Sequence, residues 1–204
     1  MRAVIISGGA VTDYDFVKEQ IRADDTVICA DSGYDHAARM GIVPSVVVGD
    51  FDSVKKMPSD VACIRYPCKK DLTDTEIALE YARSEGFGEF VFLGATGSRM
   101  DHSLANILLL KSILERGEKG VLIDEHNKVM LTDSYLQLQE PAGSVVSLIP
   151  LSDCVGITTE NLEYPLCGSQ MKMGRALGIS NVMLADNAIV SVCEGLLLVI
   201  VAKD

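Results

Sequence analysis

The sequence predicts an α/β domain with a mainly parallel sheet, followed by a small all-β sandwich domain. Two observations carry this prediction. Strand-like apolar runs alternate with helical patterns up to about residue 125, which is typical of a parallel sheet covered by helices on both faces. After Asn127 the helical patterns stop, and short β-type runs follow one another. We therefore expect two domains, an α/β domain at 1–126 and a β domain at 127–204.

The first domain is predicted to alternate strands with helices along its whole length. The strand-like runs are AVIIS (3–7), TVICA (26–30), SVVVGD (45–50), ACIRY (62–66), EFVFLG (89–94) and GVLID (120–124). Helical patterns lie between most of them, at about 13–23, 33–40, 73–85 and 101–116. Thr73 and Glu76 form a capping box, in which each side chain bonds a free backbone N–H of the other residue. Gly86 and Gly117 follow the last two helices, where glycine commonly ends a helix.

The second domain is predicted from short runs bounded by Gly, Pro, Asn or Asp. They are KVML (128–131), SYLQLQ (134–139), SVVSLIPL (144–151), VGITT (155–159), AIVSVC (188–193) and GLLLVIVA (195–202). Such runs are typical of a small antiparallel sandwich or barrel. Because a core of this size is marginal by itself, we expect the domain to depend on the first domain or on a second copy of itself.

The charge balance argues against two classes of partner. The 204 residues include 29 acidic and 18 basic side chains, which gives a formal net charge of −11. A chain this acidic is poorly suited to general binding of nucleic acid or of an anionic membrane surface. No stretch approaches the 18 uninterrupted apolar residues of a membrane span. The first residues lack the pattern of an export signal, so we expect a cytoplasmic protein.

Unusual clusters of polar residues follow the predicted strands of the first domain. They are SGGA (7–10), ADSG (30–33), GDFDS (49–53), KKDLTD (69–74) and GATGSRMDH (94–102). Each has an ordinary structural explanation: Asp31 can cap a helix, GDFDS can be a turn, and Arg99 with Asp101 can be a surface ion pair. Open parallel sheets, however, bind ligands at the carboxyl ends of their strands, and all of these clusters fall there.

Together, the clusters predict a metal and phosphate site. The carboxylates expected to converge on one rim of the sheet are Asp50, Asp52, Asp71, Asp74 and Asp101. Carboxylates that meet without a cation raise one another's pKa and cost stability, and Mg²⁺ relieves this repulsion while it binds phosphate oxygens. Lys69, Lys70 and Arg99 lie in the same loops and can meet phosphate charge directly.

These motifs, in this order, resemble those of the thiamine pyrophosphokinases, particularly the bacterial ones. The matching segments are ADSG, VGDFDS, KDLTDTEIAL and GATGSRMDHSLANI in the first domain, and SLIPL, GITTENLEYPL and GISN in the second. The resemblance implies an α/β domain that binds ATP and Mg²⁺, a β domain that binds thiamine, and a homodimer with thiamine at the subunit interface. It further implies transfer of the pyrophosphoryl group of ATP to the hydroxyl of thiamine, with release of AMP.

The resemblance also assigns residues to these tasks. It implies that the catalytic residues are Asp50, Asp52, Asp71, Asp74, Arg99 and Asp101, and that Asp50, Asp52 and Asp71 hold Mg²⁺. The implied ATP-binding residues are Asp31, Ser32, Gly33, Lys70, Thr73, Arg99 and His102. The implied thiamine-binding residues are Ser180, Asn181 and Tyr164. Either Asp74 or Asp101 is expected to accept the proton of the thiamine alcohol.

Three other functions remain open at this level. A pyrophosphokinase acting on a pterin alcohol would keep the α/β site and change the acceptor pocket. A haloacid-dehalogenase-like phosphatase also places a D-x-D sequence after an apolar strand, but usually after the first strand rather than the third. The third alternative is a nucleotide sensor without catalytic activity, which an assay for AMP separates from the enzymes.

Overall fold

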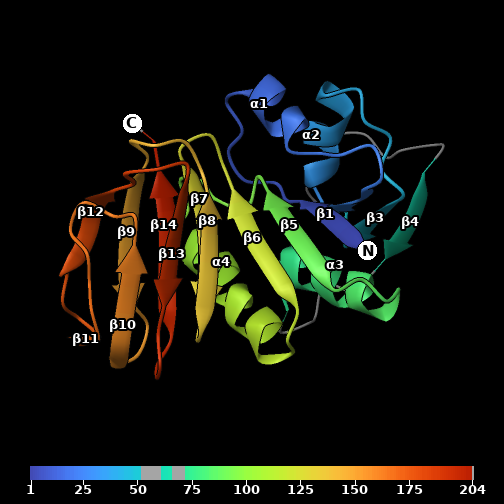
Figure 1. The fold of residues 1–204 in the computed structure, drawn as a ribbon. Coiled ribbons are helices and arrows are strands. Elements are labelled where there is room, and N and C mark those ends of the chain that lie inside the picture. Colours follow the sequence, from blue (N-terminus) through green and yellow to red (C-terminus); the bar gives the residue numbers. More distant parts are fainter. Residues whose placement is uncertain (52–60, 66–71, 204) are drawn as a thin grey trace. The chain divides into compact units, whose positions relative to one another are not determined.

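The computed structural model describes residues 1–51, 61–65 and 72–203 of the chain (Figure 1). The chain divides into two compact units, Met1–Glu125 and His126–Asp204. This division lies one residue before the boundary suggested by the sequence. The predicted Asp52, Lys70 and Asp71 lie outside the described residues. Among the residues described, no helix is long and apolar enough to cross a membrane.

The strands of the first unit form a parallel sheet in the order β6-β5-β1-β2-β3-β4. They are β1 (Arg2–Ile6), β2 (Thr26–Ala30), β3 (Val46–Gly49), β4 (Ala62–Arg65), β5 (Glu89–Leu93) and β6 (Lys119–Ile123). The chain proceeds outward from β1 to β4 and then returns to place β5 beside β1. The strand order therefore reverses between β1 and β5, and ligands of such sheets bind outside the carboxyl ends at this reversal.

Helices cover both faces of this sheet. They are α1 (Tyr14–Glu19), α2 (Gly33–Arg39), α3 (Asp74–Ser84) and α4 (Met100–Glu115). Figure 1 shows α1 and α2 on one face and α3 and α4 on the other. Successive strand residues point to opposite faces, so Val4 and Ile6 pack against the α1 and α2 side together with Val17 and Ala37. Both faces of β1, β2, β3 and β5 are buried, which explains why these strands read as continuous apolar runs.

The ends of the helices follow the local signals of the sequence, with one exception. The Thr73 hydroxyl accepts a hydrogen bond from the Glu76 N–H (3.3 Å), as expected of an N-cap. Gly86 and Gly117 adopt the left-handed conformation at φ 85° and 71°, which confirms them as helix-ending glycines. The helix predicted at 13–23 is shorter in the structure: α1 ends at Glu19, and the carbonyl of its C-cap residue, Gln20, accepts from the Arg2 guanidinium (2.9 Å).

The second unit consists of two antiparallel sheets, which confirms the all-β prediction. One sheet has the strand order β12-β9-β14-β7 and the other β11-β10-β13-β8. The strands are β7 (Asn127–Thr132), β8 (Tyr135–Gln139), β9 (Val145–Pro150), β10 (Cys154–Glu160), β11 (Ser169–Met171), β12 (Gly178–Val182), β13 (Asn187–Ser191) and β14 (Leu197–Ala202). Sequence patterns missed β11 and β12. β11 is short, and β12 carries a register shift between Gly178 and Asn181 with Ser180 at φ 59°.

Gly33 provides a test of the packing between α2 and β1. A Cβ at this position would collide with the Ile6 carbonyl oxygen and lie 2.6 Å from its carbonyl carbon, and backbone atoms cannot rotate away. We expect Gly33→Ala to lower the free energy of unfolding by about 1–3 kcal/mol. Gly88→Ala is the matched control, because nothing lies within 4 Å of its added Cβ. Equal stability of both variants in chemical denaturation would contradict this packing.

Candidate functional site

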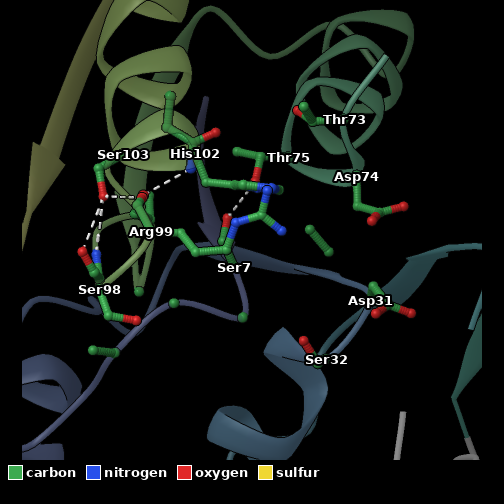
Figure 2. Close-up of a pocket in the computed structure, with 18 residues that line it drawn as sticks. Ser7, Asp31, Ser32, Thr73, Asp74, Thr75, Ser98, Arg99, His102 and Ser103 are labelled. Atoms are coloured by element: carbon green, nitrogen blue, oxygen red, sulfur yellow. Dashed lines mark hydrogen bonds between the residues drawn. The ribbon is translucent and has the colours of Figure 1, made fainter. Parts of the chain in front are cut away.

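A cavity of about 560 Å³ opens at the carboxyl ends of β1, β2 and β5 in the first unit (Figure 2). It is lined by residues of the loops after these strands and of the first turns of α3 and α4. In sequence these are 7–10, 30–32, 73–75 and several positions between 94 and 106. The cavity thus lies at the reversal of the strand order, and its volume is in the range of a small-molecule site.

Two glycine-containing turns form one wall of the cavity by direct backbone contact. The Gly9 N–H donates to the Gly94 carbonyl (2.6 Å), and the Ala10 N–H donates to the Thr96 carbonyl (2.8 Å). A Cβ at Gly9 would collide with both of these carbonyl oxygens. A Cβ at Gly8 would collide with the Ser32 hydroxyl. The SGGA turn, which is a weak signal in the sequence, therefore has a definite geometric requirement for glycine.

Buried polar side chains between the strands and helices complete the cavity, and sequence reasoning missed them. The hydroxyls of Ser7 and Thr75 are 2.9 Å apart, and both residues are almost fully buried. The Asn106 amide donates to the Ala95 carbonyl (2.7 Å). Ser7, Thr75 and Asn106 occur inside the conspicuous motifs, but single Ser, Thr and Asn residues have no pattern that marks them as pocket residues.

The cavity brings together part of the predicted site. Figure 2 shows Asp31 and Asp74 on one side, with Ser98 and Ser103 on the other. Among the described residues, the predicted positions that line it are Asp31, Ser32, Thr73, Asp74, Arg99 and His102. Gly33, Asp50 and Asp101 do not line it. Gly33 packs on β1, and Asp50 directly follows β3. Of the carboxylates expected to converge, only Asp74 lines the cavity among the described residues, and Asp31, which was predicted to bind ATP, lines it as well.

Arg99 and Asp101 form an ion pair at the start of α4. Arg99 Nη2 lies 2.6 Å from Asp101 Oδ2, and Arg99 Nε donates to Oδ1 at 3.2 Å. The hydrogen bond from Arg99 lowers the pKa of the Asp101 carboxyl to about 2, although both side chains are about two-thirds exposed. Arg99 is the N-cap position of α4, and its carbonyl accepts from the Ser103 hydroxyl (3.0 Å). Asp101 lies in the first turn of α4, and its pairing with Arg99 is the surface ion pair that the sequence allowed.

In the second unit, the Asn181 side chain forms hydrogen bonds with the backbone of Tyr164. The Asn181 amide donates to the Tyr164 carbonyl (2.8 Å), and its Oδ1 accepts from the Tyr164 N–H (3.0 Å). Asn181 is 7% exposed, whereas the Tyr164 side chain is 64% exposed. Ser180 is also exposed, and its N–H donates to the Ser147 hydroxyl (3.1 Å). The three predicted thiamine-binding residues thus lie together, with the Asn181 amide engaged by the protein backbone.

Comparison with known proteins agrees with this division into two units. Residues 17–122 match the family model of the thiamin pyrophosphokinase catalytic domain, and residues 134–197 match that of the thiamin pyrophosphokinase vitamin B1 binding domain. The chain belongs to the thiamine pyrophosphokinase family. The pyrophosphokinase catalytic match covers every described segment that lines the cavity except 7–10.

Individual relatives of the thiamine pyrophosphokinase family span nearly the whole chain. Thiamine pyrophosphokinase of Bacillus subtilis (strain 168) is 30% identical over 173 residues, which cover 80% of this chain and 81% of that protein. The crystal structure of thiamine pyrophosphokinase from Bacillus subtilis superposes with a TM-score of 0.91 at 25% identity, covering 100% of both chains. That of the enzyme from Geobacillus thermodenitrificans gives 0.87 at 26% identity, covering 100% of this chain and 98% of the other.

The thiamine pyrophosphokinase resemblance implies a Mg²⁺ site. Only some of its implied ligands lie in the described part of the chain. Of its three implied ligands, Asp50 is described, whereas Asp52 and Asp71 are not. Within residues 1–51, 61–65 and 72–203, no three Asp, Glu, His or Cys side chains are grouped closely enough to hold a metal ion. The oxygen-rich character of the predicted set agrees with the preference of Mg²⁺ for carboxylates.

The bonds of Asn181 predict a structural effect that differs from that of its neighbour. Asn181→Ala removes three part-buried hydrogen bonds, two with the Tyr164 backbone and one from the Val182 N–H, and leaves the Tyr164 backbone groups without this partner. We expect it to lower the free energy of unfolding of the second unit by about 1–3 kcal/mol in chemical denaturation. Ser180→Ala, at an exposed position next to it, should change this free energy by less than about 0.5 kcal/mol. Similar values for the two variants would show that the amide does not hold the Tyr164 segment.

Proposed function

We propose that the protein is a cytoplasmic thiamine pyrophosphokinase, which transfers the pyrophosphoryl group of ATP to the hydroxyl of thiamine and releases AMP. The observation that carries this proposal is the cavity at the strand reversal, in a chain whose two units match the catalytic and vitamin B1 binding domains of that family. The alcohol of thiamine attacks the β-phosphorus of ATP, and the bond to the α-phosphate oxygen breaks as AMP leaves. The alcohol proton must pass to a base.

The chemistry of the cavity supports ATP as its ligand. The first turn of α3, at 73–75, faces the cavity, and the free N–H groups of a helix N-terminus favour phosphate. Gly8 and Gly9 line the cavity with backbone atoms alone, which permits close approach of a phosphate or a base. We assign Asp31, Ser32, Gly33, Lys70, Thr73, Arg99 and His102 to ATP binding.

Arg99 supplies fixed positive charge for the phosphates. In the protein alone it is paired with Asp101 at the surface, where water screens both charges. Exposed ion pairs of this kind contribute little to stability, so exchange of Asp101 for a phosphate group costs little. Arg99 can therefore turn to ATP when it binds, and a guanidinium matches the geometry of two phosphate oxygens.

Asp74 is the better of the two candidates for the base. It lines the cavity at the first position of α3, whereas Asp101 does not line it. Its place in the cavity favours Asp74 where the sequence leaves both residues open.

We propose that Asp50, Asp52 and Asp71 hold Mg²⁺ through their carboxylate oxygens, which are the ligands that this ion prefers. When bound, the ion neutralises charge on the phosphate oxygens during transfer. Asp50 lies at the carboxyl end of β3, on the same edge of the sheet as the cavity. The chain supplies the position of these carboxylates and the acidic environment that favours a divalent cation.

The second unit is proposed to bind thiamine and to form a homodimer with the thiamine site at the subunit interface. Thiamine carries a positive thiazolium ring, for which an exposed aromatic side chain such as Tyr164 is a suitable partner. Ser180 and Asn181 are the polar residues beside it. Large apolar side chains are also exposed in this unit, namely Leu177, Ile179 and Leu184. Association of two copies about a two-fold axis would remove such residues from water.

The competing functions have less support. A haloacid-dehalogenase-like phosphatase places its D-x-D sequence after the first strand, whereas Asp50 follows β3. A pterin-specific pyrophosphokinase would share the first unit, but residues 134–197 match the vitamin B1 binding domain. Because the chain belongs to the thiamine pyrophosphokinase family, its matches favour neither alternative.

The products of the reaction test this proposal directly. Incubation with ATP, Mg²⁺ and thiamine should give thiamine diphosphate and AMP in equal amounts, which mass spectrometry distinguishes from all other products. Thiamine monophosphate with ADP would overturn the transfer of a pyrophosphoryl group. Inorganic phosphate alone would favour a phosphatase, and turnover of a pterin alcohol but not of thiamine would favour the pterin enzyme.

Two conservative substitutions test the choice of base. Asp74→Asn should lower kcat by about a hundredfold or more, because the amide cannot accept the alcohol proton. Asp101→Asn is the matched control in the α4 turn, and we expect it to lower kcat by less than about tenfold, since it removes an exposed partner of Arg99. Thermal unfolding verifies that both variants are folded. A larger loss of kcat in Asp101→Asn than in Asp74→Asn would assign the base to Asp101.

A further inference from the structure

One buried side chain of the cavity keeps hydrogen-bonding groups that the protein does not use. Asn106 lies in the second turn of α4, lines the cavity and is only 6% exposed. Its Nδ2 donates to the Ala95 carbonyl at 2.7 Å. Because a carbonyl oxygen only accepts, this contact fixes which end of the amide is the nitrogen. Oδ1 is therefore the end of the amide that does not contact Ala95.

The Oδ1 atom of Asn106 is open to the cavity. No residue in the described part of the chain donates a hydrogen bond to it. It is also not among the described side-chain oxygens that are sealed from solvent without a partner. Since the residue as a whole is almost fully buried, the cavity is the space that Oδ1 reaches. The amide thus keeps one acceptor, and a second hydrogen on Nδ2, beyond its bond to Ala95.

A second neutral polar group lines the same cavity. The hydroxyls of Ser7 and Thr75 lie 2.9 Å apart, one from the turn after β1 and one from the first turn of α3 (Figure 2). Two hydroxyls carry two hydrogens, and the bond between them uses one. The other hydrogen has no acceptor among the described residues, so it is available to a ligand in the cavity. Neither this pair nor Asn106 carries a charge.

An open acceptor oxygen in this position discriminates between the parts of ATP. Phosphate oxygens accept hydrogen bonds and are negatively charged, so they do not provide the donor that Oδ1 needs. The donors of ATP are the amino group of adenine and the hydroxyls of ribose. Adenine places its amino group beside ring nitrogens that accept, which complements a planar amide with one acceptor and one donor. A ribose hydroxyl lacks this planar pair, so the edge of the base is the better complement.

We propose that Asn106 is a specificity-determining residue of the nucleotide site, whose Oδ1 accepts a hydrogen bond from the amino group of adenine. This inference rests on the proposed ATP-dependent function, in which Arg99 and the first turn of α3 bind the phosphates. The bond to Ala95 holds the amide in one orientation before the nucleotide binds. Inosine triphosphate has a keto oxygen in place of the amino group. It therefore brings an acceptor to Oδ1 and leaves both oxygens without a donor.

The test compares ATP with inosine triphosphate in the full chain and three variants. Asn106→Leu removes the whole amide, whereas Asn106→Asp removes the bond to Ala95 but keeps an acceptor oxygen. Ser103→Ala is the control, because Ser103 lines the cavity from the same helix and its hydroxyl bonds the backbone of Gly97 and Arg99. Calorimetry with Mg²⁺ gives the dissociation constants, and kcat/KM is measured with thiamine. The two deoxyribose analogues of ATP test the ribose, and thermal unfolding verifies that each variant is folded.

The decisive quantity is the ratio of the two dissociation constants, because both nucleotides share the ribose and the triphosphate. The wild type should bind ATP about five- to a hundredfold more tightly than inosine triphosphate. Asn106→Leu should bring the two affinities within about twofold of each other, chiefly by weaker binding of ATP. Asn106→Asp should still prefer ATP by about fivefold or more, since its carboxylate accepts from the amino group. Ser103→Ala should change both affinities alike and keep the wild-type ratio.

Equal affinity of the wild type for ATP and inosine triphosphate would overturn the inference without any variant. So would folded Asn106→Leu and Asn106→Asp proteins that weaken both nucleotides by the same factor, because loss of the bond to Ala95 explains such a result. A change in Asn106→Leu confined to the deoxyribose analogues would place the ribose at Oδ1 and would likewise overturn it. Failure of the proposed function is a separate result: the wild type would bind ATP in preference to inosine triphosphate but form no thiamine diphosphate.

Discussion

The first unit depends on the close approach of backbone segments where β1, β2 and β5 end. Gly8, Gly9 and Gly33 lie where a Cβ would collide with a neighbouring hydroxyl or carbonyl group. Because no side chains separate these segments, the Gly9 and Ala10 N–H groups reach carbonyls of the loop after β5. This contact sets the wall of the cavity, and α4 begins a few residues further along the same loop. A change of one methyl group at the crossing would therefore be transmitted to the whole site.

The charges of the site suit the proposed binding of an anionic nucleotide by an acidic protein. The net charge of −11 repels ATP at long range. The positive charge that offsets this repulsion must therefore lie close to the ligand. The N-terminus of α3 faces the cavity, and Arg99 stands at the N-cap position of α4 with an exposed carboxylate as its partner. An exposed partner is easily exchanged, whereas a buried one would have to be replaced at a high desolvation cost. Exposure of the Arg99–Asp101 pair thus suits a residue that must change partners.

In the second unit, the hydrogen bonds of Asn181 bear on the role that its motif suggests. The sequence GISN marks Asn181 as a ligand-binding residue by resemblance, yet its buried amide is engaged by both backbone groups of Tyr164. In the proposed acceptor site its role would therefore be indirect, through the segment that presents the exposed Tyr164 side chain. Ser180 and Tyr164 remain the side chains that are open to a ligand. A substitution of Asn181 that affects thiamine would act by moving its neighbours.

The sequence by itself determined the features that depend on local or periodic signals. Alternating apolar runs and helical patterns predicted the parallel sheet, the Thr73 cap and Gly86 located α3, and the polar clusters located the strand ends. The tertiary structure alone decided the reversal between β1 and β5, and it paired Ser7 with Thr75 across 68 positions. It also joined Arg2 to the Gln20 carbonyl at the end of α1 and directed His36 to Gly9. Caps and periodicity depend on neighbours within a few residues, whereas these contacts join distant segments whose approach depends on the packing of the whole unit.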